Sequence, residues 1–163
     1  MQVCEILTAH QVSVAGEQEG VVRSKEEALH RLSALLAAGL RAAGGAGLEV
    51  DIERVLVERE RLQSTGVGGG VAIPHGSMEG AERLVGAVLL CPRPIDFEAI
   101  DGAPVSILFA VIGPKRATGE HLKTLARISR LLRDEGFRAR LLGAPSGRAA
   151  FELIVTEEGR GAP

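Results

Sequence analysis

The chain has 163 residues, with 19 Lys and Arg against 21 Asp and Glu, and 45% of its residues are hydrophobic. This length predicts one domain over residues 1–163, with its core at about 5–155, because such a chain can bury a core without disulfides. The nearly balanced charge disfavours nucleic acid as a partner, and an aromatic content of 2% disfavours stacking on bases or sugars.

The N-terminus shows no targeting pattern, and no apolar run approaches the roughly 18 residues of a membrane span. We therefore expect a cytoplasmic protein without membrane insertion. Cys4 and Cys91 lie far apart in the sequence and neither belongs to a C-x-x-C motif, which disfavours a disulfide, a metal site or redox chemistry.

Residues 1–23 predict a short helix or strand followed by a β segment at 20–23. The run Ser24-Lys25-Glu26-Glu27 then matches a capping box, in which the serine accepts the N–H three residues on. The helix that begins here carries one apolar stripe, formed by Leu29, Leu32, Leu35, Leu36 and Leu40. It should end near Ala43, because the glycines that follow hold helical geometry only at a cost.

A second helix is expected to begin with Asp51 as its N-cap. Its apolar face is formed by Ile52, Val55, Leu56 and Leu62. The charged residues between 53 and 61, Arg59 and Glu60 among them, are expected mostly on the opposite, solvated face.

Three apolar runs predict strands. Residues 71–73 predict a short strand ended by Pro74. Residues 84–91 and 105–112 are continuous apolar runs, which are typical of strands covered on both faces of a sheet. The turn-rich connection between them is expected to bury three side chains, Ile95, Phe97 and Ile100.

The last third of the chain predicts three helices. The first has Thr118 as its N-cap, which places His121 in the first turn, where we expect it to contribute little to the core. The apolar positions of this helix are Leu122, Leu125, Ala126, Ile128, Leu131 and Leu132. Asp134 and Ser146 cap two shorter helices, and the tail 157–163 is expected to fray. Together the elements predict an α/β sandwich, a small mixed β-sheet with helices on both faces.

The stretch from Arg59 to Gly76, R-E-R-L-Q-S-T-G-V-G-G-G-V-A-I-P-H-G, is rich in glycine. It lacks the Lys-Ser/Thr ending of a nucleotide-binding P-loop and the G-x-G-x-x-G spacing, which disfavours nucleotide binding. A turn that needs positive φ angles accounts for the glycines. The alternative is a surface loop whose small residues let a partner approach His75.

The four histidines differ in their positions. His10 and His30 lie beside weak or helical patterns and are interpreted as surface or partly buried structural residues. His75 follows the end of a strand, and His121 begins a helix just after a central strand, where ligands bind in open α/β sheets. The helix N-terminus disfavours the imidazolium form of His121, so we expect a neutral imidazole there.

If these two histidines lie within reach of each other, they and Arg59 could hold a phosphoryl group. An unprotonated imidazole nitrogen is a competent nucleophile toward phosphorus. A metal site is disfavoured because no third ligand stands at suitable spacing, and a serine-nucleophile triad is disfavoured because Ser77 has no elbow motif around it.

The segment R-E-R-L-x-S-T-G-x-G-x-G-x-A-I-P-H-G closely resembles the phosphorylation-site motif of the enzyme IIA proteins of the bacterial phosphoenolpyruvate-dependent phosphotransferase system, fructose/mannitol class. The resemblance extends through I-D-F-E-A-I-D-G-A-P-V and H-L-K-T-L-A-R-I-S-R-L-L, and covers about residues 24–154. As a short, free-standing form, the chain resembles the nitrogen-related regulatory branch of the class.

The resemblance implies roles by position. His75 matches the phosphorylated histidine, carried as a tele-phosphohistidine, His121 matches the histidine that supports the phosphate, and Arg59 matches the arginine that neutralises it. The residues that would let the partner approach are Thr65, Gly66, Gly68, Gly70 and Gly76. The implied donor is the carrier HPr or its nitrogen-branch counterpart NPr, with no cofactor, nucleotide or metal.

Three functional hypotheses follow. The first is a regulatory phosphocarrier whose phosphorylation state is read by target proteins. The second is a sugar-transport IIA component that passes the phosphoryl group to a separate IIB protein. The third is a binding module that kept the fold and lost the chemistry, against which the intact set of Arg59, His75 and His121 argues.

Overall fold

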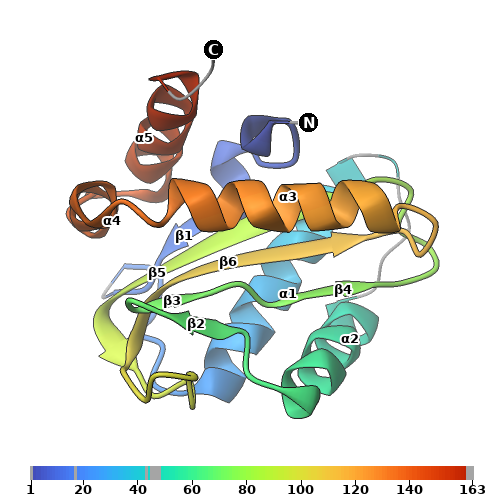
Figure 1. The fold of residues 1–163 in the computed structure, drawn as a ribbon, viewed down its shortest axis with the longest axis horizontal. Coiled ribbons are helices and arrows are strands. Elements are labelled where there is room, and N and C mark those ends of the chain that lie inside the picture. Colours follow the sequence, from blue (N-terminus) through green and yellow to red (C-terminus); the bar gives the residue numbers. More distant parts are fainter. Residues whose placement is uncertain (1, 17, 43, 45–48, 161–163) are drawn as a thin grey trace.

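The computed structural model describes residues 2–16, 18–42, 44 and 49–160, and shows a six-stranded mixed sheet between two layers of helices (Figure 1). The strands are β1 (Val12–Val14), β2 (Gly66–Gly68), β3 (Val71–Ala72), β4 (His75–Ser77), β5 (Val85–Ile95) and β6 (Val105–Gly113). Their order is β1-β5-β6-β3-β2, and β4 also pairs with β6. The predicted fold class is confirmed.

The centre of the sheet is the antiparallel pair of β5 and β6, which the two continuous apolar runs predicted. Ile95 and Phe97 are buried as expected, but the side chain of Ile100 is 66% exposed, so that part of the prediction is wrong. Ala99 packs against Gly66, and the Ile100 N–H donates to the Gly66 carbonyl. This turn buries Ala99 and leaves its neighbour on the surface.

Two short strands, β3 and β4, pair with β6 one after the other, both in the parallel sense. Between them, Pro74 has no N–H to donate, but its carbonyl accepts from the Val111 N–H at 3.0 Å. The chain therefore resumes pairing at His75, where the sequence predicted that the strand had ended. The second piece is a strand that the sequence pattern missed.

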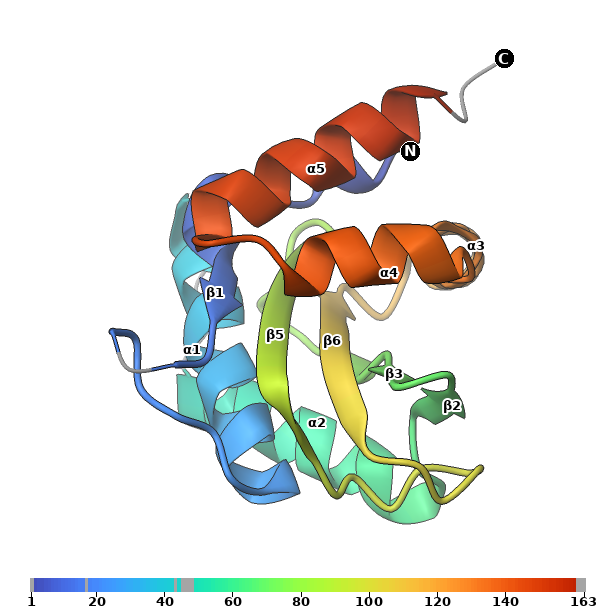
Figure 2. The same cartoon turned by 90° about the vertical axis from the view of Figure 1, so that its left-hand side faces the viewer.

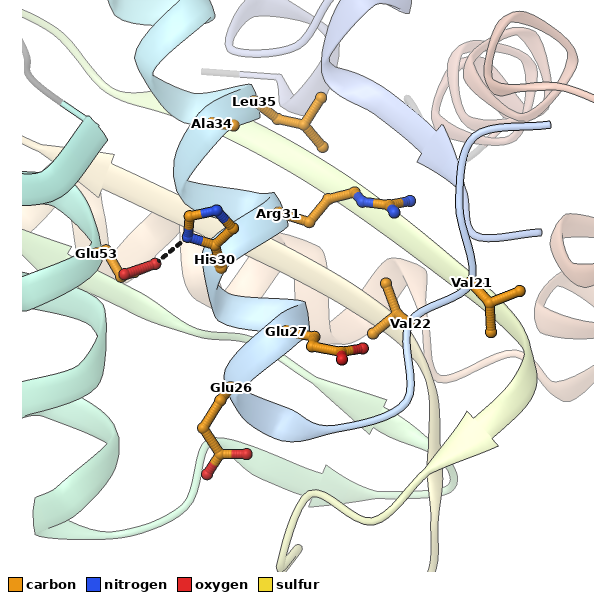
Figure 3. Close-up of a pocket in the computed structure, with 9 residues that line it drawn as sticks. All are labelled: Val21, Val22, Glu26, Glu27, His30, Arg31, Ala34, Leu35 and Glu53. Carbon is orange, nitrogen blue, oxygen red and sulfur yellow. Dashed lines mark hydrogen bonds and ion pairs between the residues drawn. The ribbon is translucent and has the colours of Figure 1, made fainter. Parts of the chain in front are cut away.

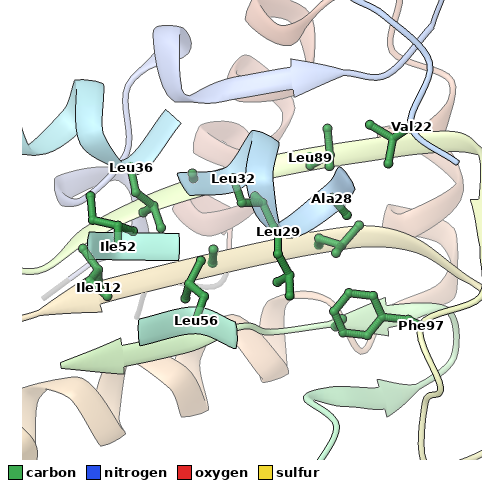
Figure 4. Packing of buried hydrophobic residues seen from close by; sticks show 14 of the residues in the cluster. Val22, Ala28, Leu29, Leu32, Leu36, Ile52, Leu56, Leu89, Phe97 and Ile112 are labelled. Atoms are coloured by element: carbon green, nitrogen blue, oxygen red, sulfur yellow. The ribbon is translucent and has the colours of Figure 1, made fainter. Parts of the chain in front are cut away.

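Helices cover both faces of the sheet (Figures 1 and 2). One layer contains α1 (Lys25–Ala42) and α2 (Glu49–Leu62), and the other contains α3 (Thr118–Leu131), α4 (Glu135–Leu142) and α5 (Gly147–Arg160). Figure 4 shows Leu32 and Leu36 of α1 and Leu56 of α2 packed over Leu89 and Ile112 of the central strands. Each fully buried side chain of this size contributes about 1.5–3 kcal/mol to the free energy of unfolding.

The helix starts follow the predicted caps in three of five cases. Ser24 accepts from the Glu27 N–H at 3.1 Å, and Asp134 and Ser146 accept in the same way at the starts of α4 and α5. Asp51 is not a cap, because α2 is already helical at Glu49.

Thr118 is not a cap either. It is the first helical residue of α3, and its hydroxyl donates to the Lys115 carbonyl instead of accepting an N–H.

The N-terminal region differs from the prediction. The strand is β1, which pairs in parallel with residues 88–90 of β5, and no strand forms at 20–23. The backbone N–H of Arg23 is instead bound by the Glu27 carboxylate at 2.7 Å, which joins this segment to the start of α1. Cys4 and Cys91 are free thiols, and burial raises the pKa of Cys91 to about 11.

The C-terminal tail is ordered further than expected. Helix α5 runs to Arg160, so the fraying predicted from residue 157 is wrong for 157–160, and residues 161–163 lie outside the described part. The Glu158 carboxylate accepts the backbone N–H groups of Val3 and Cys4, which fixes the end of the helix to the N-terminal segment. Within the described residues, no helix combines the length and apolar character needed to cross a membrane.

Candidate functional site

His75 begins β4 at the edge of the sheet, and its register partner is Val111 of β6. The Val111 side chain packs in the core on the side of α3, and paired residues in a sheet point to the same face. The imidazole of His75 therefore faces α3, where it meets His121. The two ring centroids are 5.8 Å apart and the ring planes are inclined at 71°.

The hydrogen bond of His75 decides which ring nitrogen can react. Nδ1 lies 2.8 Å from the carbonyl oxygen of Ile73. A carbonyl oxygen only accepts, so Nδ1 carries the proton and donates it. In the neutral ring, Nε2 then holds a free lone pair, as a nucleophilic nitrogen requires.

His121 is buried, with only 6% of its surface exposed, and its Nε2 has no hydrogen-bond partner among the described residues. This corrects two predictions. Leu122, expected in the core, is 63% exposed, and His121, expected to contribute little to the core, is buried in its place. The buried stripe of α3 consists of His121, Thr124 and Ile128. A buried polar atom without a partner costs about 1–3 kcal/mol, so this nitrogen favours a bound group that can pair with it.

Both imidazoles are held neutral. Burial lowers the pKa of His75, and the positive charge of Arg59 lowers it further, against the opposing effects of the Ile73 hydrogen bond and the Glu60 carboxylate. Burial also lowers the pKa of His121, with a smaller contribution from His75. The expected neutral His121 thus follows mainly from burial.

Arg59 belongs to α2, on the opposite face of the sheet, and lies close enough to His75 for its charge to lower the pKa of that histidine. It lies in the last turn of α2, where Nη1 donates to the Gln63 carbonyl at 2.9 Å and leaves other donors of the guanidinium free to bind an anion. Helix α2 can lie this close to β4 because residue 76 is a glycine. A Cβ there would overlap with the Cγ1 atom of Val55.

Glu60, which the charge pattern predicted on the solvated face of α2, is buried beside the site. It is 5% exposed and accepts from the backbone N–H and the hydroxyl of Thr65. Its Oε2 also lies 2.9 Å from the Lys25 ammonium. The spacing of Ile52, Leu56 and Glu60, four residues apart, places Glu60 on the buried stripe and is the signal that could have found it.

The glycines of the loop have structural roles of their own. Gly66 packs against Ala99, and Gly68, Gly69 and Gly70 all have positive φ angles at the turn between β2 and β3. Gly70 pairs with residue 107 of β6, four residues before Val111, so this turn lies roughly 13 Å along the strand from His75. Their predicted role in letting a partner approach stays a prediction.

Comparison with known proteins supplies the family. The model of the family "Phosphoenolpyruvate-dependent sugar phosphotransferase system, EIIA 2" matches residues 6–156. The chain belongs to this family. The "Nitrogen regulatory protein" of Bradyrhizobium diazoefficiens is 41% identical over 135 residues, which is 82% of this chain and 84% of that protein.

Two further comparisons agree with this family assignment. The crystal structure of the nitrogen regulatory protein IIA-Ntr from Neisseria meningitidis superposes with a TM-score of 0.81 at 32% identity, covering 93% of this chain and 98% of that one. The fructose-specific EIIABC component of Bacillus subtilis is 29% identical over 94% of this chain, but the match covers 23% of that longer protein. The predicted likeness to the nitrogen-regulatory branch of the EIIA family is confirmed.

A surface groove of this EIIA family member lies apart from the histidine pair, along α1 (Figure 3). It has a volume of about 600 Å³, and Glu26, Glu27 and Arg31 line it together with the pair of His30 and Glu53. His30 Nδ1 lies 2.6 Å from the Glu53 carboxylate and joins α1 to α2, which confirms the structural interpretation of His30. In the described part of the chain, no three His, Cys, Asp or Glu side chains gather as metal ligands.

The burial of the imidazoles of His75 and His121 predicts that acid destabilises the protein. The histidines of the unfolded chain take up protons below a pH of about 6.5. In the folded chain, His75 and His121 take up protons only at a lower pH, because burial lowers their pKa values. Their stabilising contribution is complete above that pH and is lost as the pH falls through the lowered pKa values of the folded state. Urea unfolding at about pH 7.5 and about pH 5 measures this loss.

The variant His121→Gln isolates one of the two groups, because every other titrating residue is retained. The free energy of unfolding should fall less on acidification in this variant than in the wild type. An equal fall in both proteins would show that His121 titrates in the folded chain as it does in the unfolded chain.

Proposed function

We propose that the chain accepts a phosphoryl group on Nε2 of His75 from the phosphohistidine of an HPr-type carrier, HPr or NPr, and that target proteins read its phosphorylation state. The observation that carries this proposal is the hydrogen bond from Nδ1 of His75 to the Ile73 carbonyl, which leaves Nε2 as the nucleophile. The neighbouring His121, with its unpartnered Nε2, and Arg59 supply the surroundings that a phosphoryl group needs.

The transfer step is an in-line displacement. The lone pair of His75 Nε2 attacks phosphorus as the bond from phosphorus to the carrier imidazole breaks, and the electron pair of that bond returns to the carrier. His75 keeps its Nδ1 proton, so no proton transfer within the site is required. Catalysis then rests on positioning and on neutralising roughly two negative charges, for which Arg59 and an N–H of His121 are available.

The regulatory role is supported by the nitrogen-regulatory relatives, which match this chain over most of their own length. The fructose-specific EIIABC relative of Bacillus subtilis is a longer protein, of which this chain matches 23%. A sugar-transport IIA component that hands its phosphoryl group to a separate IIB protein is the alternative, because both functions use the same acceptor histidine.

Phosphoenolpyruvate with enzyme I and HPr or NPr should label the wild-type chain with one phosphoryl group that is labile in acid and stable in alkali. The variant His75→Ala should take up none, because it lacks the acceptor nitrogen. Mass spectrometry and acid quenching follow the label, and His10→Ala, at an exposed histidine outside the site, is the matched control. Persistent labelling of His75→Ala would refute the assignment.

His121 should support the transfer through an N–H at the position of Nε2. His121→Ala removes this donor and should slow phosphoryl acceptance about a hundredfold, because the loss of one hydrogen-bond donor to a charge in the transition state typically has an effect of this size. His121→Gln keeps an N–H at a similar reach and should recover part of the rate. Rapid-quench kinetics compare them, and wild-type rates in both variants would exclude the role.

Transfer onward from the phosphorylated chain separates the two functions. With purified fructose- and mannitol-class IIB proteins, we expect the chain to retain its label over times in which a transport IIA protein would pass it on. Rapid transfer to a IIB protein, coupled to sugar uptake, would contradict the regulatory role and establish the alternative.

A further inference from the structure

Glu60 is a buried carboxylate beside a reaction site that uses no carboxylate. It is the neighbour of Arg59 in the last turn of α2, yet the two side chains point in different directions. Its oxygens accept from the Thr65 N–H at 3.0 and 3.1 Å, from the Thr65 hydroxyl, and from the ammonium of Lys25 at 2.9 Å. Lys25 is the first residue of α1, so Glu60 ties the starts of α1 and β2 to the end of α2.

A continuous series of contacts leads from Glu60 to the nucleophile. Thr65, held by Glu60, accepts the Ile73 N–H on its own carbonyl at 3.0 Å. The carbonyl of Ile73 in turn accepts from Nδ1 of His75 at 2.8 Å. Each member therefore restrains the next, and the last contact decides which nitrogen of His75 is free.

We propose that Glu60 is a positioning residue for phosphoryl acceptance by His75: through Thr65 and Ile73 it holds the carbonyl that keeps the proton on Nδ1 and the lone pair on Nε2. It also fixes the turn of α2 from which Arg59 reaches the site. The expected effect of Glu60 on the rate of phosphoryl transfer rests on the proposed function. Its expected effect on the tautomer of His75 does not.

A carboxylate suits this position better than an amide. Both oxygens of Glu60 accept, and the donors that face them are an N–H, a hydroxyl and an ammonium. A glutamine would turn an NH₂ group toward one of these donors and would remove the nearer of the two carboxylates beside Lys25, leaving Glu98 at 3.9 Å. Loss of a buried partner is costly, and the strain would fall on the Thr65 backbone.

Glu60 also acts on His75 by its charge. The charged and titratable groups that face His75 are Arg59 and Glu60 from α2 and His121 from α3. Glu60 raises the pKa of His75 against burial and Arg59, so its neutralisation should lower that pKa further.

The test compares Glu60→Gln with Glu58→Gln, which removes the same charge from an exposed position on the same helix. Phosphoryl transfer from the HPr-type carrier should slow about tenfold in Glu60→Gln at saturating carrier, with KM for the carrier unchanged, because alignment and not docking is affected. Glu58→Gln should react as the wild type does. Equal slowing of the two variants would overturn the proposal in favour of a general charge effect.

Nitrogen NMR of the His75 ring provides the second measurement and needs no donor protein. In Glu60→Gln the fraction of rings protonated on Nε2 should rise and the His75 pKa should fall, whereas a residue that only stabilises the fold would leave both unchanged in the folded protein. An unchanged tautomer and pKa would overturn the proposal. If the wild type accepts no phosphoryl group but Glu60→Gln still changes the tautomer and pKa of His75, the positioning role of Glu60 is upheld and the proposed phosphocarrier function is refuted.

Thr65→Val keeps the proposal testable if Glu60→Gln does not fold. It removes only the hydroxyl donor to Glu60 and retains the backbone contact, so we expect the same change in tautomer and rate at a smaller, several-fold size. A wild-type tautomer and rate in this variant would count against the series of contacts.

Discussion

The hydrogen bond from Nδ1 of His75 to the carbonyl of Ile73 is the contact on which the proposed phosphoryl acceptance depends. Donor and acceptor lie two positions apart in the chain, with Pro74 between them, where the pairing with β6 is interrupted between β3 and β4. Pro74 produces that break, because it cannot donate to the ladder and its carbonyl alone bonds to β6. The reactive tautomer is thus a consequence of backbone geometry.

The position of β4 at the sheet edge explains how residues from both faces reach one imidazole. Helix α3 lies on the face toward which His75 points, and α2 lies on the other face. In the middle of the sheet, the strands would separate a residue of α2 from one of α3. At the edge, Gly76 admits Val55, and the end of α2 can bring Arg59 near the ring.

Local patterns in the sequence were enough for the central strands, the helical stripe of α1 and the caps Ser24, Asp134 and Ser146. Two of the errors arose where adjacent residues compete for one buried position, Ala99 with Ile100 and His121 with Leu122. On α3 hydrophobicity favours Leu122 for the core, but the helix buries His121 together with Thr124 and Ile128 and exposes Leu122. Glu60 follows Ile52 and Leu56 on the buried stripe of α2, but a carboxylate can be buried there only because Lys25 and Thr65 bind it, and these partners lie outside the helix.

The free site stores a free-energy cost that a phosphoryl group would relieve. Burial lowers the pKa of both imidazoles, and Nε2 of His121 has no partner among residues 2–16, 18–42, 44 and 49–160, a cost that other packing must offset. A phosphoryl group on His75 would bring oxygen acceptors to this nitrogen and an anion to Arg59. Because His121 and Arg59 already lie near His75, phosphorylation would change the charge of the sheet edge far more than its shape. A target protein that distinguishes the two forms would therefore have to recognise this change in charge.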